Sequence, residues 1–471
     1  MSAWPGSLRG QARAGDGPRR NVLVLLTDDQ TYNTIMMLGN GRMHTPNLDR
    51  LAAQGTTMSH CFNQGGWHGA ICVASRAMMH CGRHLWRVVE PHNHRDAGLL
   101  SVDGPLWAEH FRASGYATFG TGKWHNGGAS FARSFSHGDA VFLGGMHPYN
   151  KQRGNAGGPI TLGHVGPDLR HYDGAAGSFE RYDTGEAWST DLYADAAASF
   201  IESRRGADDP FFAYVSFAAP HDPRHAPQQY LAHYSLDEIE LPPNFLGEHP
   251  FDFGVRRIRD EAYLPYPRDP EVVKLELLRY YAMISHIDDR VGDLIDMLKA
   301  IGQLDNTYIV FTSDHGLAMG EHGLLGKQNL YDHSVRVPMV WRGPGIAPGE
   351  ISRELVYLHQ LYPTTCELAG LAMPENLDVP SLVPVIRGEQ GSYRSIYGAY
   401  TDTIRMLRTD RYKLIRYPKI GESQLFDLEQ DPWEMNDLAE QDGAANRVSR
   451  LDQALRDWMV SAGDPLELVG L

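Results

Sequence analysis

Cysteine is scarce in this chain, with four among 471 residues, at positions 61, 72, 81 and 366. Four cysteines are too few for a disulfide-stabilised scaffold. Cys61, Cys72 and Cys81 lie near histidines, but no Cys-x-x-Cys pair accompanies them, which disfavours a structural zinc site. Long hydrophobic runs are missing as well. No stretch approaches the ~18 apolar residues of a membrane span, so we expect no membrane partner.

Positive charge is in deficit. Lys and Arg number 43 against 58 Asp and Glu, which gives a formal net charge of −15. A chain this acidic is a poor partner for nucleic acid or for anionic lipid, and we expect neither. The deficit does not exclude an anionic substrate, because a local group of cations can act inside a negative overall field.

The first 20 residues lack the apolar core of a secretory signal and carry four arginines among Gly, Ser and Pro. We expect residues 1–20 to form a disordered tail. As the sequence stands, this predicts a cytoplasmic protein. A periplasmic or secreted protein is expected instead if a signal was removed.

Short apolar runs alternate with helical patterns along most of the chain. Buried strands are predicted at 21–26, 116–120, 211–217 and 308–311. Helices are predicted at 45–55, 105–114, 189–201 and 272–300. This order predicts an α/β fold, with a large, mostly parallel (mixed) sheet sandwiched by helices.

The pattern changes near Arg387-Gly388-Glu389. Short alternating strands follow at 395–399, 404–408 and 412–417, and a closing helix runs from about 446 to 460. We therefore predict a catalytic domain over 21–388 and a smaller C-terminal α+β subdomain over 389–471, built on an antiparallel sheet. Two irregular regions, 126–188 and 222–268, are predicted as loops over the active face that set specificity.

Polar side chains follow each of the four predicted buried strands. They are Asp28 and Asp29, Lys123 and His125, His221, and Asp314 and His315. In parallel sheets covered by helices, sites form at the carboxyl ends of the strands. Each group alone could be an ordinary surface loop, but four of them at one edge indicate a functional site.

Three of these side chains are carboxylates that like-charge repulsion would disfavour unless a cation lay between them. Oxygen ligands such as Asp28, Asp29 and Asp314 favour one hard divalent ion, Ca²⁺ or Mg²⁺. His315 could add a ring nitrogen, which leaves room for Mn²⁺. The alternative for Asp28-Asp29 is a turn after a strand. The Ser313-Asp314-His315-Gly316 segment favours the metal site.

A Gly-rich segment leads into Cys72-Val73-Ala74-Ser75-Arg76, which predicts a loop entering a helix with Cys72 at its amino end. Helix amino ends favour anionic groups. Arg76 returns to the same face one turn later, where its planar guanidinium suits a tetrahedral anion. The plainer interpretation is a buried free cysteine that begins a core helix.

Further cations and proton donors are expected at the same edge. Lys327 lies in a Gly-punctuated loop after the Asp314 strand. A lone lysine is usually solvated, and a lone histidine after a strand is usually structural. Together with Arg76 and a metal, Lys123, His125, His221 and Lys327 could neutralise a tetrahedral anion and protonate its leaving oxygen.

Eight segments in fixed order carry a resemblance to a known family. They are NVLVLLTDDQ at 21, TPNLDRLAAQG at 45, CVASR at 72, GYATFGTGKWHNG at 115, APHDP at 219, SDHG at 313, GKQNLYDHSVRVPM at 326 and RYKLIRY at 411. Over nearly its whole length the chain resembles the type I (formylglycine-dependent) sulfatases of the alkaline phosphatase superfamily.

The resemblance implies that a formylglycine-generating maturation enzyme oxidises Cys72 to formylglycine, whose hydrated diol attacks sulfur. It implies one divalent metal ion, with Ca²⁺ expected first and Mg²⁺ or Mn²⁺ as alternatives. The implied metal ligands are Asp28, Asp29, modified Cys72, Asp314 and His315. Among the implied catalytic residues, modified Cys72 is the nucleophile, and Arg76 and Lys123 hold the sulfate and stabilise the diol. His125 helps to expel sulfate from the covalent intermediate. His221 and Lys327 contact the sulfate and the leaving oxygen. His221 is the first choice for general acid.

Three positions depart from the commonest family pattern. Ala74 stands where Pro is usual, and some bacterial maturation systems accept Ala. His315 replaces a common Asn and also occurs in related phosphonate monoester hydrolases. Gln360 replaces an acidic residue, a change we expect to be structural.

Three hypotheses follow for the function. The first is a sulfatase that acts on a small-molecule or oligosaccharide sulfate ester, with a sulfated carbohydrate favoured. The second is a phosphonate monoester hydrolase or phosphodiesterase on the same scaffold. The third is a non-catalytic binding protein in which Cys72 stays unconverted.

Overall fold

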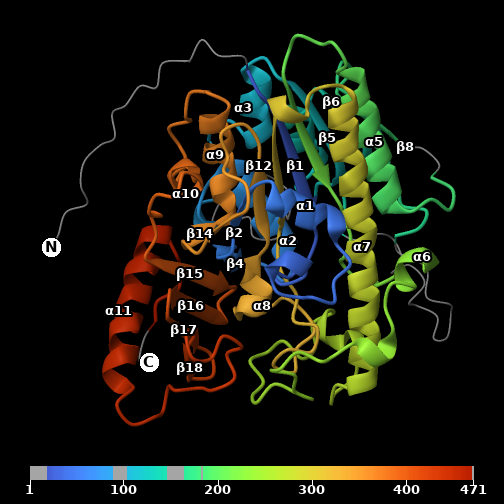
Figure 1. Cartoon of the computed structure of the whole chain (residues 1–471). Coiled ribbons are helices and arrows are strands. Elements are labelled where there is room, and N and C mark those ends of the chain that lie inside the picture. The colour runs from blue at the N-terminus through green and yellow to red at the C-terminus, as the bar shows by residue number, and fades with distance from the viewer. Residues whose placement is uncertain (1–18, 89–102, 146–163, 182–183, 469–471) are drawn as a thin grey trace.

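The computed structural model describes residues 19–88, 103–145, 164–181 and 184–468. The predicted tail at 1–20 lies almost entirely outside these residues. Within the described part, a ten-stranded mixed sheet forms the centre of the molecule (Figure 1). Its strands, in spatial order, are β13 (Glu350–Ser352), β2 (Thr56–Met58), β12 (Met339–Arg342), β10 (Thr307–Ser313), β1 (Asn21–Thr27), β9 (Phe211–Ser216), β5 (Ala117–Lys123), β6 (His137–Phe142), β7 (Arg170–Asp173) and β8 (Ser178–Arg181).

The four predicted buried strands are neighbours in the middle of this sheet. β1 pairs in parallel with β10 on one side and with β9 on the other, and β9 pairs in parallel with β5. In this register Thr27 at the end of β1 lies opposite Ser313 at the end of β10. The carboxyl ends of all four strands therefore meet at one edge of the sheet, as the sequence predicted.

Helices cover both faces of the sheet because β1 is apolar on both of its sides. Leu23 and Leu25 pack in one core with α1 (Pro46–Ala53), α5 (Ser189–Ser203) and α7 (Pro270–Ala300). Val22, Val24 and Leu26 pack in a second core with residues of α2 (Ile71–Cys81), α3 (Trp107–Ala113), α4 (Gly128–Ser134) and α9 (Leu361–Leu368). This alternation is the period of two that a strand buried on both faces requires. The predicted α/β sandwich is confirmed.

The longest helix, α7, begins at a complete start signal. The Asp269 side chain accepts a hydrogen bond from the backbone N–H of Glu271 at 2.9 Å, and Pro270 occupies the first helical position. Figure 1 shows α7 and α5 side by side along one side of the sheet. Tyr280, on the buried stripe of α7, reaches the site described below.

A smaller five-stranded sheet lies beside the main one. Its strands, in order, are β18 (Glu422–Asp427), β17 (Tyr412–Tyr417), β16 (Ile404–Thr409), β15 (Ser395–Tyr400) and β4 (Gly65–Gly66). β15 to β18 are antiparallel, and α11 (Ala445–Ala462) covers them, which confirms the predicted α+β module. The predicted boundary at 388/389 falls between α10 (Val383–Ile386) and β15. β4 comes from far earlier in the chain and pairs in parallel with β15.

Helix α2 lies between the two sheets and is buried along its whole length. Met79 packs in the core of the main sheet, whereas Ala74, Ala77 and Met78 pack against residues of the smaller sheet and α11. Gly82 ends the helix in a left-handed conformation (φ 62°).

The prediction of an irregular loop at 126–188 is wrong for the described residues. This region contains α4 and the strands β6, β7 and β8, which extend the main sheet. β7 and β8 form an edge hairpin with exposed positions, so their sequences lack the apolar runs of buried strands. The region 222–268 is irregular as predicted, apart from α6 (Gln228–Leu231) and short turns.

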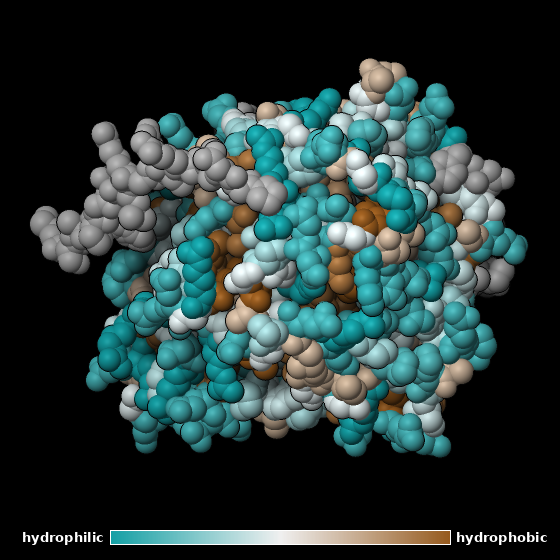
Figure 2. Space-filling model, turned by 45° about the horizontal axis from the view of Figure 1, so that its top comes forward, coloured by the Kyte–Doolittle hydropathy of each residue, from teal (hydrophilic) through white to brown (hydrophobic). Residues whose placement is uncertain are grey.

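The remaining elements are short. A three-stranded sheet joins β11 (Arg336–Val337), β3 (Cys61–Phe62) and β14 (Val356–Tyr357), and α8 (Asp332–Val335) precedes β11. The face of the molecule in Figure 2 is mainly hydrophilic, and hydrophobic residues show mostly in recesses. Among the described residues, no helix combines the length and apolar character needed to cross a membrane.

Candidate active site

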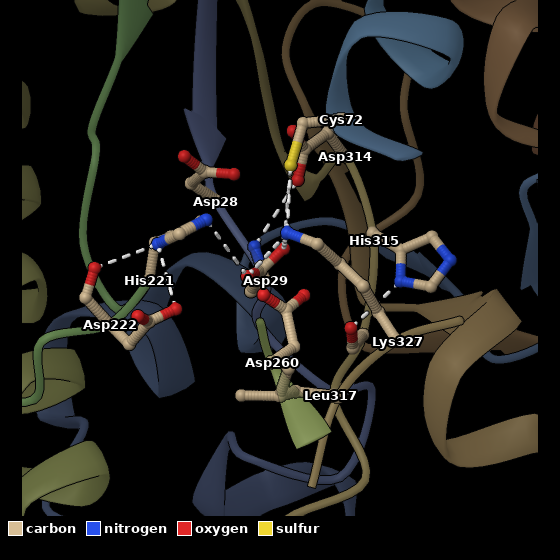
Figure 3. A network of polar contacts seen from close by, with 12 residues as sticks. Asp28, Asp29, Cys72, His221, Asp222, Asp260, Asp314, His315, Leu317 and Lys327 are labelled. Carbon is tan, nitrogen blue, oxygen red and sulfur yellow. Dashed lines mark hydrogen bonds and ion pairs between the residues drawn. The ribbon is translucent and has the colours of Figure 1, made fainter. Parts of the chain in front are cut away.

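The predicted site residues converge at the carboxyl edge of β10, β1, β9 and β5 (Figure 3). Lys327, from the segment between β10 and α8, reaches into the middle of the group. Its Nζ lies 2.5 and 2.7 Å from the two carboxylate oxygens of Asp29 and 2.8 Å from Cys72 Sγ. Lys123, the last residue of β5, forms a buried ion pair with Asp28. Residues nearly 300 positions apart in sequence thus share one buried cluster.

Arg76 is fixed by three contacts. Its Nε donates to Asp314 Oδ2 at 2.8 Å, and its Nη1 donates to the Lys123 carbonyl at 2.5 Å and to Ser216 Oγ at 2.6 Å. Nη2 lies 3.9 Å from Asp28 Oδ1, and neither atom has a hydrogen-bond partner among the described residues. The guanidinium is therefore oriented with one donor still available inside the site.

Four side chains form a group that could hold a metal ion. Ligand atoms of Asp28, Asp29, Cys72 and His221 all lie within 4.8 Å of one another, and all four residues are buried. Asp28 Oδ1 is buried and has no hydrogen-bond partner among the described residues, which is energetically unfavourable. A cation bound beside it would supply a partner. This donor set of two carboxylates, a thiol position and an imidazole fits a divalent ion. From the sequence, His221 was expected to be a catalytic residue and was not among the expected metal ligands.

Asp314 and His315 lie at the site but outside that group. Asp314 Oδ1 accepts a hydrogen bond from the Asp29 backbone N–H at 3.2 Å, and its other oxygen accepts from Arg76. The His315 ring points away from the carboxylates (Figure 3), with Nδ1 2.8 Å from the Gly316 carbonyl and Nε2 unpartnered among the described residues. Their roles as metal ligands stay predictions.

Asp29, just after β1, has a positive φ of 72°, an uncommon backbone conformation for a residue other than glycine. The Tyr280 hydroxyl donates to the Asp29 carbonyl at 2.6 Å and accepts from the Thr31 N–H at 2.9 Å. These bonds and the Asp314 contact hold the turn in this conformation. Tyr280 is a site residue that the sequence reasoning missed, because nothing marks it among the apolar residues of a long helix.

The thiol of Cys72 is not a ready nucleophile. Burial raises the pKa of Cys72 well above its usual value, and the Asp28 charge adds to the effect, so the thiol stays protonated. Cys72 occupies the first turn of α2, whose N-cap residue Ala70 supplies no side-chain hydrogen bond. The predicted position at a helix amino end is confirmed. The raised pKa disfavours a thiolate at this position.

The charged groups of the site influence one another strongly. Burial raises the pKa of Asp29 to about 7, although Lys327 opposes it. Burial acts to lower the pKa of Lys327, but the surrounding negative charges, Asp29 first, together outweigh it and raise the pKa well above its usual value. For Asp28, burial acts to raise the pKa, and Lys123 and Arg76 reverse this into a net lowering. Lys327 and Arg76 therefore stay cationic.

Two histidines face the same cluster. Burial lowers the pKa of His221 well below its usual value, and the charges of Lys327 and Lys123 act in the same direction. The pKa of His125 is lowered in the same way, by burial and then by Lys123 and Arg76. Both rings are therefore neutral until an anion binds beside them. His125 Nε2 lies so close to Gly145 that a Cβ there would come within 2.3 Å of it.

Two family profiles match this chain. The profile of the family named Sulfatase matches residues 20–371, and that of the C-terminal part of N-sulphoglucosamine sulphohydrolase matches residues 320–461. The chain belongs to the sulfatase family. A choline-sulfatase of Rhizobium meliloti is 30% identical to it over 453 residues, covering 89% of this chain and 82% of the relative.

Solved structures share the sulfatase fold over almost the whole chain. A protein captured in complex with its substrate D-glucosamine-2-N,6-O-disulfate has a TM-score of 0.75 at 22% identity, covering 95% of this chain and 99% of that one. The phosphonate monoester hydrolase of Agrobacterium radiobacter has a TM-score of 0.72 at 22% identity, covering 94% and 96%.

Family membership makes this sulfatase a hydrolase of sulfuric ester bonds, and the non-catalytic hypothesis falls away. A metal ion and a formylglycine are general features of the family. The group of Asp28, Asp29, Cys72 and His221 is a place in this chain that could hold the metal ion.

Proposed function

We propose that residue 72, as formylglycine, is the nucleophile of this sulfatase. The observation that carries the proposal is the position of Cys72, whose Sγ lies 2.8 Å from Lys327 Nζ and 3.7 Å from Asp29 Oδ1 at the amino end of α2. A maturation enzyme with its own oxidant would convert the Cβ–SH carbon to an aldehyde, with loss of the sulfur. Hydration then gives a diol whose oxygens take the place of the protonated thiol.

Asp28, Asp29 and residue 72 would hold one divalent ion, with Asp314 and His315 as the further ligands that the family resemblance implies. Ca²⁺ is the ion we expect first, because carboxylates dominate the set. Bound there, the ion supplies positive charge that polarises oxygen and favours the anionic form of the nucleophile. Arg76, Lys123 and Lys327 are the chain's own cations around that place.

The protein groups divide the work of a two-step transfer. One diol oxygen of residue 72, having lost its proton to water, attacks sulfur, and the S–O bond to the leaving group breaks. His221, protonated once the anionic substrate is bound, gives the leaving oxygen the proton on Nε2 and returns to the neutral form. Loss of the proton from the second hydroxyl, aided by His125, then restores the aldehyde and expels sulfate. Arg76, Lys123 and Lys327 stabilise the sulfate oxygens throughout.

The substrate class we propose is a sulfated carbohydrate. Support comes from the fold neighbour that was solved in complex with its substrate, a disulfated glucosamine.

Intact mass and activity test the nucleophile together. Conversion of Cys72 lowers the mass by roughly 18 Da, as the bonding change requires. We expect matured protein to show this loss and to release inorganic sulfate. Cys72→Ala should abolish turnover without altering the fold, whereas Cys81→Ala, at the other end of α2, should retain it. Sulfatase activity that survives Cys72→Ala, or that accompanies an unconverted Cys72, would refute the assignment.

A second candidate activity is cleavage of phosphonate monoesters or phosphodiesters. The observation that favours it is the 94% coverage of this chain by the fold of a phosphonate monoester hydrolase, together with a histidine at position 315. Parallel assays of aryl sulfate, aryl phosphonate and phosphodiester substrates on matured protein rank the two. A larger kcat/KM for the phosphonate would make it the main activity.

A further inference from the structure

His221 is held by the residue that follows it. Its Nδ1 lies 2.8 Å from the Asp222 carbonyl oxygen and 3.2 Å from Asp222 Oδ1. Both are acceptors, so Nδ1 carries a hydrogen. The other ring nitrogen, Nε2, faces the site and lies 3.7 Å from Asp29 Oδ2. Asp222 therefore fixes which nitrogen of His221 exchanges a proton with substrate.

Arg259 in turn holds the Asp222 carboxylate. Its Nη1 and Nη2 donate to the two carboxylate oxygens of Asp222 at 2.7 and 3.1 Å, a bidentate pair. The Asp222 side chain is only 10% exposed and that of Arg259 is 29% exposed, so solvent competes little for the contact. Arg259 comes from the irregular region 222–268, far from the strand that carries His221.

The same guanidinium continues the network towards Lys327. Arg259 also forms an ion pair with Asp260, whose Oδ2 accepts from Gln328 Nε2 at 2.7 Å. Gln328 follows Lys327 directly, and its Oε1 accepts from the Lys327 backbone N–H at 3.1 Å. Arg259 thus bridges the carboxylate behind His221 and the carboxylate behind the Lys327 loop.

We propose that Arg259 is a positioning residue of this enzyme, which acts through Asp222 to aim His221 Nε2 at the leaving-group oxygen. The inference rests on the proposed role of His221 as general acid. Without Arg259, the Asp222 carboxylate is released from its bidentate contact and the imidazole loses its fixed orientation. Proton transfer to the leaving group then fails, while the charges that bind sulfate remain.

The dependence of rate on the leaving group separates this role from a structural one. A good leaving group departs without a proton, whereas a poor one needs the general acid, which typically contributes about 10²- to 10⁴-fold. Arg259→Gln should therefore lower kcat/KM for 4-nitrophenyl sulfate by less than about 3-fold. For phenyl and alkyl sulfates it should lower kcat/KM by about 10- to 100-fold, a share of that contribution.

The experiment uses matured full-length protein and a series of aryl and alkyl sulfates of rising leaving-group pKa. Arg256→Gln is the matched control, since Arg256 lies three positions earlier and pairs with Glu248 at 2.9 Å. We expect Arg256→Gln to leave kcat/KM unchanged for every substrate of the series. Asp222→Asn should steepen the dependence on leaving-group pKa as Arg259→Gln does, and Arg259→Lys should restore part of the loss. The converted fraction of residue 72 is measured by mass for every variant.

His221→Ala distinguishes a failure of the inference from a failure of the proposed function. If His221→Ala steepens the leaving-group dependence and Arg259→Gln does not, Arg259 has no positioning role. The inference is also overturned if Arg259→Gln lowers kcat/KM by the same factor for every substrate, whatever its leaving group. If His221→Ala itself lowers all rates equally, the general acid is another residue and the proposed function needs revision.

Discussion

At the scale of single residues, Asp314 has two candidate roles, as a ligand of the metal ion and as the hydrogen-bond acceptor that orients Arg76. Both of its carboxylate oxygens already accept hydrogen bonds, from the Asp29 N–H and from Arg76. Its backbone carbonyl accepts from Ser75 Oγ at 2.6 Å and from Asn63 Nδ2 at 2.9 Å, so the residue is fixed from several directions. A carboxylate in that position can serve a metal ion, the guanidinium, or both.

We predict that Asp314→Asn lowers bound metal and activity together. The amide keeps the shape of the side chain and an acceptor for the Asp29 N–H, but removes the negative charge that the ion requires. Metal affinity should fall by at least about 10-fold, the lower end for changes close to a metal ligand. Metal analysis of purified protein measures this, with Asp305→Asn as control, since the Asp305 side chain is 94% exposed. An unchanged metal content in Asp314→Asn would mean that Asp314 serves to orient Arg76 and does not bind the metal ion.

The sequence predicted site residues by two signals: a position just after a buried strand, and a Gly-punctuated segment for Cys72, Arg76 and Lys327. Asp28, Lys123 and His221 follow apolar runs, and parallel pairing brings such positions together. Tyr280 and Arg259 could not be predicted in this way. One lies on the buried face of a long helix and the other in an irregular region, so their contacts arise only from tertiary packing.

At the scale of elements, β5 and β9 pair at Gly122, which lies opposite Ser216 with no room for a side chain. A Cβ on this residue would lie 1.9 Å from the Ser216 carbonyl oxygen, and its φ is 81°. Gly122 directly precedes Lys123, and Ser216 contacts Arg76. The distance between the two strands here therefore sets the relative positions of two cations of the site.

Gly122→Ala should destabilise the fold by about 2 kcal/mol or more, since backbone strain of about 1–3 kcal/mol adds to the steric clash. Gly206→Ala is the control, because Gly206 also has a positive φ of 73° but open space around its Cβ position. That variant should cost only about 1 kcal/mol. Thermal unfolding followed by circular dichroism compares the two. If Gly122→Ala and Gly206→Ala lost the same amount of stability, β5 and β9 would be able to move apart at Gly122 at little cost.

Elements with a long apolar run or a complete helix start signal were predictable. The predicted strands at 21–26 and 211–217 and the helix at 45–55 agree with the structure within a few residues. The edge strands β7 and β8 were missed because they are largely exposed and carry no continuous apolar run. The inner strands β2 and β12 were missed because they are only three and four residues long.

At the scale of the whole molecule, a buried ion cluster joins the smaller sheet to the catalytic part. Lys413 of β17 lies 2.9 Å from Asp332 of α8 and 2.7 Å from Glu434, and its side chain is fully buried. Burial acts to raise the pKa of Asp332, but Arg408 and Lys413 reverse this and hold it well below its usual range. The segment that carries Lys327 leads directly into this cluster.

Lys413→Met should destabilise the protein by about 3–5 kcal/mol, because it leaves two buried carboxylates with too little positive charge. Lys419→Met offers a matched control. Lys419 pairs with Asp402 at 2.5 Å, but their side chains are 54% and 61% exposed, so the loss should stay below about 1 kcal/mol. Urea unfolding at neutral pH measures both. A small effect at Lys413 would show that the cluster relaxes or admits water.

Glu321 should make stability depend on pH. Burial raises the pKa of Glu321 from 4.5 to about 8, while a hydrogen bond from Asn244 at 2.9 Å acts in the opposite direction. Between these values the folded state holds a proton that the unfolded state has lost, so stability falls as pH rises from about 4.5 to 8.

Glu321→Gln removes that proton linkage. Between pH 5 and pH 8 we expect its free energy of unfolding to gain on that of the parent by about 1.4 kcal/mol per pH unit. Melting temperatures of both proteins across this range measure the change. The exposed Glu350→Gln serves as control. A difference between parent and Glu321→Gln that stays constant over this range would show that Glu321 is ionised in the folded protein.

The pairing of β4 with β15 limits how this enzyme can be divided. Gly65 and Gly66 lie opposite Ala399 and Tyr400, and the chain then runs only a few residues further to Cys72. A fragment that stops at residue 388 would leave this approach segment without its hydrogen-bonded neighbour. C-terminal modules exchanged between homologous enzymes would have to bring a compatible segment 61–70 with them. The C-terminal sheet thus supports the backbone that leads to residue 72, so it belongs to the framework of the candidate active site.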